Sequence, residues 1–342
     1  MKILGENLFK EKVFPEPFSK TFLYRKRGFL LYEGWRIMTE WMEIFRRNFP
    51  DTVREERKVL EILKNPENRI LEKRADSGAL IGVCVVHKNT VYLLCADKEY
   101  RGRGIASELL AEAEVIVKEA GYPEISVGAG DSYLAPGVPT SQPFYPEDGF
   151  AERGVENLYT GLTDDAAEFF RKRGYVHSWD GCDCFDMRFP LSEFPENSIC
   201  AGETADGILY RFASAEDIPE IKKCTDDAHE NFTKYYTDET KYTGEFGERV
   251  LIALDGNEVC GTLIVCTETE GEGIGSVGCT TVRHSHRGRH IAVNMVKIGT
   301  GFLKDSGMTD AYLGYTYTGL DRLYGHSGYK ICTYYMMAQK KL

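Results

Sequence analysis

The stretch Arg101-Gly102-Arg103-Gly104-Ile105-Ala106 and its near copy Arg287-Gly288-Arg289-His290-Ile291-Ala292 decide the fold of this 342-residue chain. Each copy follows an apolar run and opens a helical pattern. Further on, each is followed by a pair ending in an aromatic residue and then by Gly-Tyr. These are Phe169-Phe170 with Gly174-Tyr175, and Leu323-Tyr324 with Gly328-Tyr329. A four-part pattern repeated in the same order predicts two related domains.

The two copies differ in the number of residues between the glycine-rich stretch and the aromatic pair. They open at residues 101 and 287, and their aromatic pairs end at 170 and 324, so the first copy holds an insertion. Residues 131–162 account for it, with interleaved prolines and aromatics that disfavour a helix or a central strand. A loop of this kind is a binding loop, an interface or a flap over an apolar patch. We expect domains at 1–200, including this insertion, and at 205–342.

Each domain is expected to mix helices and strands. For the first domain the patterns predict helices over 36–48, 54–64, 105–120 and 163–173, and strands over 69–74, 80–86, 90–96 and 124–129, with further strands up to about 190. For the second they predict strands over 208–213, 249–254, 259–267, 275–282, 310–315 and 329–338, and helices after Asp217, over 291–304 and around 318–326. The clean 3.6-residue period after each glycine-rich stretch supports this assignment.

The glycine-rich stretches have the chemistry of a phosphate cradle. A strand that leads straight into such a loop and a helix leaves several backbone N–H groups unpaired at the positive end of the helix dipole. Glycine lets the backbone approach a pyrophosphate closely. The P-loop pattern fails because no Lys-Ser or Lys-Thr follows the glycines, and the dinucleotide fingerprint fails because Arg stands at its first position.

Composition limits the partners. The formal net charge is −11, from 42 basic and 53 acidic residues, and no dense basic run occurs, which disfavours nucleic acid. The first twenty residues have no apolar signal region and no later run is long enough to span a membrane, so we expect a cytoplasmic chain with no membrane partner. Cys182 and Cys184 are two of the four ligands that a zinc site needs, so no metal is expected.

These features together resemble the GNAT superfamily of acyl-CoA-dependent N-acyltransferases, whose cradle reads Gln/Arg-x-x-Gly-x-Gly/Ala. The resemblance covers most of the chain and implies an α+β fold of two GNAT-like domains, each a mixed, mostly antiparallel twisted sheet flanked by helices. It implies acetyl-CoA as cosubstrate, with its pyrophosphate on the cradle and its pantetheine arm along the preceding strand. The residues so implied are Cys95, Ala96, Arg101, Gly102, Arg103, Gly104, Ile105, Ala106, Thr281, Val282, Arg287, Gly288, Arg289, His290, Ile291 and Ala292.

The two copies depart from the family pattern in complementary places. In many GNAT proteins a tyrosine after the cradle helix protonates the departing thiolate. Tyr324 stands at that position in the second copy, whereas Phe170 stands there in the first. In the second copy His290 replaces the cradle glycine. It obstructs the pyrophosphate, contacts it, or only supplies an unusual backbone angle that histidine tolerates.

The reaction also needs a base. An alkyl amine with a pKa of ~10.4 is almost fully protonated at neutral pH and must lose a proton before it attacks. The candidates are His284, His286, Glu268 and Glu270 in the second domain, and Asp97 and Glu99 in the first.

From these observations we expect an N-acetyltransferase that acts on a primary amine, either a small molecule or a peptide. The amine attacks the thioester directly, and the C-terminal domain, with Tyr324 as catalytic residue, is favoured. Two alternatives stay open: catalysis in the N-terminal domain with the C-terminal half as scaffold, or a CoA-binding sensor without activity. A homo-oligomer also stays open.

Overall fold

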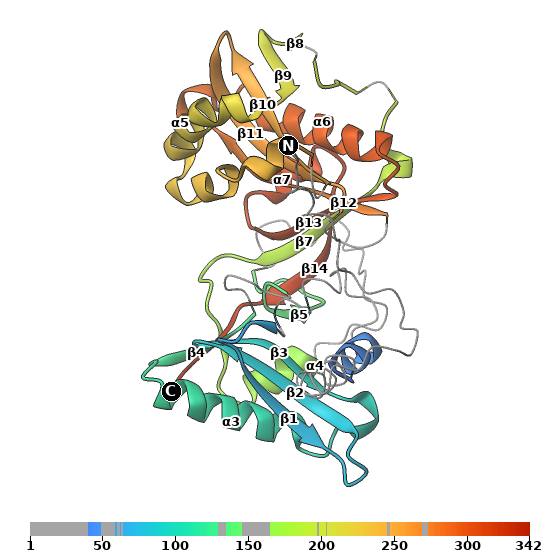
Figure 1. The fold of residues 1–342 in the computed structure, drawn as a ribbon, viewed down its shortest axis with the longest axis vertical. Helices are drawn as coiled ribbons and strands as arrows, with labels where there is room; N and C mark the ends of the chain where they lie inside the picture. Colours follow the sequence, from blue (N-terminus) through green and yellow to red (C-terminus); the bar gives the residue numbers. More distant parts are fainter. Residues whose placement is uncertain are drawn as a thin grey trace, which may run out of the picture.

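The computed structural model describes residues 40–48, 59, 62, 64–128, 135–145, 165–196, 198–202, 204–244, 247–268 and 273–342. In this part of the chain two β-sheets form, each with helices packed against it, and they stand one above the other in Figure 1. No helix that the structure describes is long and apolar enough to cross a bilayer. Residues 40–48 are helical, as expected, whereas most of the helix expected over 54–64 lies outside the described residues.

The first sheet has six strands in the order β1-β2-β3-β4-β15-β6. They are β1 (Arg69–Arg74), β2 (Leu80–His87), β3 (Thr90–Ala96), β4 (Glu124–Val127), β15 (Ala338–Lys341) and β6 (Val176–His177). The first three form the antiparallel series that the sequence predicts. β4 is parallel to β3, and helix α3 (Ile105–Glu119) makes the crossover that a parallel pair needs.

The second sheet has nine strands in the order β5-β14-β7-β13-β12-β11-β10-β9-β8. They are β5 (Val138–Thr140), β14 (Lys330–Met336), β7 (Cys184–Pro190), β13 (Asp310–Tyr317), β12 (Ile274–Val282), β11 (Glu258–Cys266), β10 (Glu248–Asp255), β9 (Ile208–Phe212) and β8 (Thr204–Ala205). Here β13 is parallel to β12, with helix α6 (Ile291–Asp305) as the crossover. The second domain thus repeats the plan of the first.

Two strands cross between the sequence halves. β7 follows the first half of the chain but inserts between β13 and β14 of the second sheet. β15 ends the second half but inserts between β4 and β6 of the first sheet. In Figure 1 the green β7 enters the upper sheet, and the red C-terminal segment descends to the lower one. The single closing strand expected over 329–338 is therefore two strands, because the chain leaves one sheet after Met336 and enters the other at Ala338.

His177 holds the point where the exchanged strands cross. The backbone N–H of Met337, between β14 and β15, donates to His177 Nδ1 at 3.0 Å. His177 Nε2 lies 3.0 Å from the carbonyl oxygen of Cys182, just before β7. These two partners require a neutral imidazole with its proton on Nε2. One side chain therefore joins β6 to both crossing segments.

The cradle helices end in the same way. After α3, Gly121 (φ +86°) donates to the carbonyl of Lys118 at 2.9 Å, and Tyr122 donates to that of Val117 at 3.2 Å. After α6, Gly307 (φ +83°) and Met308 repeat both bonds at 2.9 and 3.1 Å, onto the carbonyls of Lys304 and Leu303. This is the Schellman arrangement, in which the left-handed residue after the last turn is glycine. The predicted end of the first cradle helix near residue 120 is confirmed.

Each sheet is covered on both faces, which gives every domain two apolar layers. In the first, α3 and α4 (Asp165–Arg171) cover one face and the helix over 40–48 covers the other. In the second, α6 and α7 (Asp321–Gly325) cover one face and α5 (Ile218–Ala228) covers the other. The core between the first sheet and its helices includes Met336 and Ala338, so the C-terminal segment is part of the first domain's interior.

Of the insertion over 131–162, the structure describes residues 135–145. They contribute β5, which pairs with β14 at the outer edge of the second sheet and contains Pro139. An edge strand tolerates a proline because its outward N–H position needs no partner. The aromatic residues expected to line this loop at Tyr133, Phe150 and Tyr159 lie outside the described residues.

Candidate active site

The two cradles have the same backbone. Gly104 (φ +85°) precedes α3 in the left-handed conformation, and His290 (φ 58°) precedes α6 in the same conformation. Gly102 and Gly288, at φ +77° and +81°, also match. Glycine adopts this conformation freely and histidine is among the residues that tolerate it. His290 therefore preserves the shape of the loop that glycine gives in the first copy.

Matching hydrogen bonds fix each cradle to its sheet. Arg101 Nε donates to the carbonyl of Ala96, and Arg287 Nε donates to that of Val282, both at 3.4 Å. Behind each strand a polar side chain from the preceding helix caps the turn. Asn48 Oδ1 accepts the N–H of Lys98 at 2.9 Å, and Asp227 Oδ2 accepts that of His284 at 2.8 Å. The bond to this backbone N–H is the first cause that lowers the pKa of Asp227.

The space in front of the cradles is open. A Cβ at Gly102 or Gly288 would meet no protein atom within 4 Å, and one at Gly104 would meet only Glu108 Oε1 at 4.0 Å. The exposed side chains of Arg101, Arg103, Arg287 and Arg289 surround the loops. Unpaired backbone donors, an open approach and nearby cations suit a pyrophosphate.

Two glycines that the sequence analysis missed bring the helix starts close to the sheets. A Cβ on Gly82 of β2 would lie 2.5 Å from Ile105 Cγ2, and one on Gly261 of β11 would lie 3.1 Å from Ile291 Cγ2. These isoleucines are the first residues of α3 and α6. A lone glycine inside an apolar strand indicates such a close approach, so the sequence did contain this information.

The strand before each cradle separates from its parallel neighbour. β3 pairs with β4 only through Thr90 and Val91, and β12 pairs with β13 only through residues 274–276. Beyond these contacts the arms diverge, and they include the predicted residues Cys95, Ala96, Thr281 and Val282. The side chains of Cys95 and Thr281 are buried, and the Thr281 hydroxyl is bonded to that of Thr262. These two residues therefore offer a ligand mainly their backbone.

The gap in the second domain is flanked by two strained residues. Cys279 on β12 (φ 50°) and Tyr315 on β13 (φ 56°) adopt the left-handed conformation at irregularities in the strand register. Such residues cost about 1–2 kcal/mol each and persist where their surroundings hold them. The Tyr236 hydroxyl donates to the Cys279 carbonyl, and Asp186 Oδ1 accepts the Tyr315 N–H at 2.7 Å. Asp186 belongs to the exchanged strand β7.

Tyr324 lies beside this gap. Its side chain on α7 is buried, and its hydroxyl is hydrogen-bonded to Thr280 Oγ1 on β12 at 3.1 Å. Burial raises the pKa of Tyr324 to about 12, so the phenol is protonated at neutral pH. Phe170 occupies the corresponding place in the first domain and packs edge-on against Tyr175 at 5.2 Å, as Tyr324 packs against Tyr329 at 6.0 Å. The packing repeats, but the hydroxyl is present only in the second copy.

The candidate bases have other partners. The exposed His284 pairs with Asp227, and His286 Nε2 lies 3.4 Å from Asp255. Both histidines follow β12 at the cradle end, past Thr280. In the first domain, Asp97 is paired with Arg47. Glu270 lies outside the described residues.

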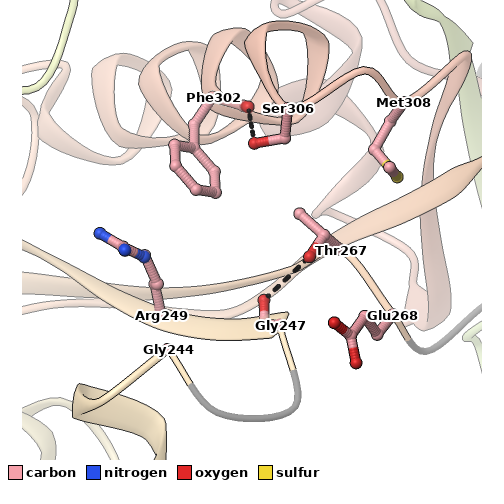
Figure 2. A pocket seen from close by; sticks show the side chains of 8 residues that line it. All are labelled: Gly244, Gly247, Arg249, Thr267, Glu268, Phe302, Ser306 and Met308. Carbon is pink, nitrogen blue, oxygen red and sulfur yellow. Dashed lines mark hydrogen bonds between the residues drawn. The ribbon is translucent and has the colours of Figure 1, made fainter.

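Glu268 lines a separate cleft of about 360 Å³ at the carboxyl end of α6, the opposite end from His290. Figure 2 shows Phe302, Ser306 and Met308 on one side of it, with Arg249 and Thr267 on the other. Among the described residues, no three histidine, cysteine, aspartate or glutamate side chains group as metal ligands.

A cradle at a helix start, a splayed parallel strand pair and a phenol at the gap are the features expected from the resemblance to acyl-CoA-dependent acyltransferases. Residues 35–150 match the model of the acetyltransferase (GNAT) family. The match falls on the first domain and covers about a third of the chain.

Solved structures share the fold of both domains. A tandem GNAT protein from the clavulanic acid biosynthesis pathway is 14% identical, with a TM-score of 0.62, over 89% of this chain and 94% of that one. A GCN5-related N-acetyltransferase from Sphaerobacter thermophilus is 17% identical, with a TM-score of 0.57, over 84% of this chain and 85% of that one.

A glucosamine N-acetyltransferase region in a fungal multi-domain GH3 β-N-acetylglucosaminidase is 18% identical, with a TM-score of 0.66. The match covers 88% of this chain but only 36% of that protein. A search of curated proteins for related sequences found no match. At these identities the structural matches establish the fold of two GNAT-like domains.

Proposed function

We propose that this protein transfers the acetyl group of acetyl-CoA to a primary amine, and that the second domain is the catalytic one. The observation that carries the proposal is the hydrogen bond between the Tyr324 hydroxyl and Thr280 on the splayed strand. It puts a proton donor at the gap between β12 and β13, where the strand leads into the cradle at Arg287.

In this proposal the pyrophosphate binds to the N–H groups of residues 288–292 at the start of α6, where the helix dipole favours an anion by about 0.3–2 kcal/mol. The pantetheine arm runs along β12 toward Thr280. The peptide between Cys279 and Thr280 is planar and trans, so its N–H points opposite to the carbonyl that Tyr236 holds. We assign this N–H to the thioester oxygen, on which negative charge develops.

The amine attacks the carbonyl carbon, a C–N bond forms and the C–S bond breaks. Tyr324 gives its proton to the departing sulfur, and the amine loses one proton to water or to a base. A phenol with a pKa of about 12 is a weaker acid than a thiol, whose pKa is ~8.5 in water, so proton transfer from Tyr324 to the thiolate is unfavourable on these values alone. Burial compensates in part, because it also raises the pKa of a thiol that loses its proton in the same site.

A second candidate places catalysis in the first domain. The family match over residues 35–150 favours it, since this is the half that retains the cradle glycine at Gly104. There the position of Tyr324 is taken by Phe170, so another group would have to protonate the thiolate.

Calorimetric titration with acetyl-CoA, combined with release of free CoA thiol across a panel of amines, tests the proposal. We expect two binding sites per chain and amine-dependent release of CoA. A single site that is lost in Gly104→Val but kept in Gly288→Val would move the function to the first domain. Binding without release for any amine would leave a sensor.

A further inference from the structure

The second domain's gap has an aromatic wall that comes partly from the segment assigned to the first domain. Trp179, in the loop between β6 and β7, stacks on Tyr315 with ring centres 5.9 Å apart and an interplanar angle of 24°. Its ring also meets Tyr317 edge-on at 6.4 Å. Both tyrosines belong to β13, the arm that faces β12 across the gap. We call Trp179, Tyr315 and Tyr317 the aromatic wall.

The strand exchange brings Trp179 to this position. The loop over 178–183 is bonded to the end of β13, since Asp183 N–H donates to Thr318 Oγ1 at 2.9 Å and Thr318 N–H donates to the Asp183 carbonyl at 3.1 Å. The insertion supports the loop from behind. Tyr145 donates its hydroxyl to the Trp179 carbonyl at 3.2 Å, and its N–H goes to the Asp183 carboxylate. The loop is thereby fixed against the second domain.

The wall borders the reacting position and is open to solvent. Tyr317 ends β13 and is 44% exposed, and Tyr315 lies at the register irregularity that flanks the gap. On the other side, Tyr235 is 43% exposed and precedes Tyr236, whose hydroxyl donates to the Cys279 carbonyl on β12. An acceptor that reaches Thr280 from the side of these residues passes exposed aromatic rings.

The carboxylates near the wall are already satisfied. Asp183 accepts the N–H groups of Phe144 and Tyr145. Asp186 accepts the phenols of Tyr312 and Tyr335 together with a backbone N–H. They leave little capacity for the hydroxyls of a sugar or the second ammonium of a polyamine, since each carboxylate is buried and bonded. What the aromatic wall presents is flat apolar surface, whose ring faces also attract one ammonium group.

We infer that Trp179 is a specificity-determining residue of the second domain's site, and that the acceptor is a primary amine carried on an aromatic body. This rests on the proposed function. The aromatic wall holds the ring of the acceptor while its amine extends to Thr280. An ammonium group held by ring faces is not held by a carboxylate, so it loses its proton more readily.

The test compares 2-phenylethylamine, n-butylamine and glucosamine as acceptors for the full-length protein, with acetyl-CoA saturating. We expect 2-phenylethylamine to have the highest kcat/KM. Trp179→Leu should raise its KM about tenfold, with little change in kcat, and should affect n-butylamine much less. Trp179→Phe, which keeps an aromatic ring, should have a KM for 2-phenylethylamine close to that of the wild type. Trp41→Leu, the same substitution on the far face of the first sheet, should leave the KM for 2-phenylethylamine unchanged.

If Trp179→Leu does not fold, the same three amines can be compared in Tyr317→Leu, since Tyr317 is exposed. A preference for glucosamine, or an equal effect of Trp179→Leu on all three amines, would overturn the inference and leave the acetyltransferase function standing. If none of the three amines released CoA, the proposed function itself would be refuted.

Discussion

The two domains share the backbone of the cradle and the bonds that fix it to the sheet, and they differ where the chemistry would occur. Tyr175 donates its hydroxyl to Glu114 at 3.0 Å, and in the second domain Tyr329 is hydrogen-bonded to Thr300 at 2.9 Å. On the short helix that precedes these tyrosines, Phe170 of α4 in the first domain corresponds to Tyr324 of α7 in the second. A duplicated fold can thus keep its architecture in both copies while one copy alone has a proton donor at the gap.

The two domains also complete each other's sheets, which predicts the largest effect. Expressed separately, residues 1–200 would lack β15 and residues 205–342 would lack β5 and β7, so each would expose strand edges that are paired in the whole chain. We expect neither half to be soluble and folded alone, and co-expression to restore a folded pair. Circular dichroism and size-exclusion chromatography check this. Two separately folded halves would show that the exchange is dispensable.

Valine at Gly82 or Gly261 would disturb one cradle at a time and so distinguish their roles. At Gly82 its Cβ would lie 2.5 Å from Ile105, and at Gly261 it would lie 2.8 Å from Met295. Overpacking should cost about 1–3 kcal/mol and displace the start of the adjacent helix. We expect each variant to weaken the binding of acetyl-CoA to the adjacent cradle about tenfold, as measured by calorimetry. Loss of turnover in Gly82→Val but not in Gly261→Val would assign catalysis to the first domain.

His290 tests whether the second cradle depends on a side chain or only on backbone shape. Replacing it with glycine removes the strain of a left-handed residue, about 1 kcal/mol, but increases the entropy of the unfolded chain by a similar amount. We expect His290→Gly to change stability by less than about 0.5 kcal/mol and acetyl-CoA affinity by less than about threefold. A tenfold weakening would show that the imidazole binds phosphate.

A smaller effect concerns the ion pair between Arg211 and Asp217 at the start of α5. Two guanidinium N–H groups, at 2.7 and 2.8 Å, lower the pKa of Asp217 to about 2. The pair therefore stabilises the fold above the unfolded pKa of ~3.9, and its contribution is lost as the pH falls toward 2. Because Arg211 is 37% exposed, we expect Asp217→Asn to lose only about 1 kcal/mol at pH 7. In urea unfolding, a difference that did not shrink with falling pH would contradict this.

The sequence predicted the features that depend on local pattern. The cradles, both long helices and most of the strands up to β14 follow from periodicity and turn residues, whereas the short strands β5 and β8 were not predicted. The strand exchange could not be predicted, because a strand pattern does not specify its partner. The residue patterns of β7 and β15 would be the same whichever sheet they joined. The register irregularities at Cys279 and Tyr315, and the placement of Trp179 beside β13, depend on that exchange and were missed with it.

The most direct test of the central claim compares Tyr324→Phe with Tyr329→Phe. Each removes one buried hydroxyl from the same core, but only that of Tyr324 is bonded to the splayed strand. We predict that Tyr324→Phe lowers kcat about 100-fold with acetyl-CoA affinity unchanged, and that Tyr329→Phe keeps kcat within about threefold. Wild-type turnover in Tyr324→Phe would contradict the assignment of catalysis to the second domain.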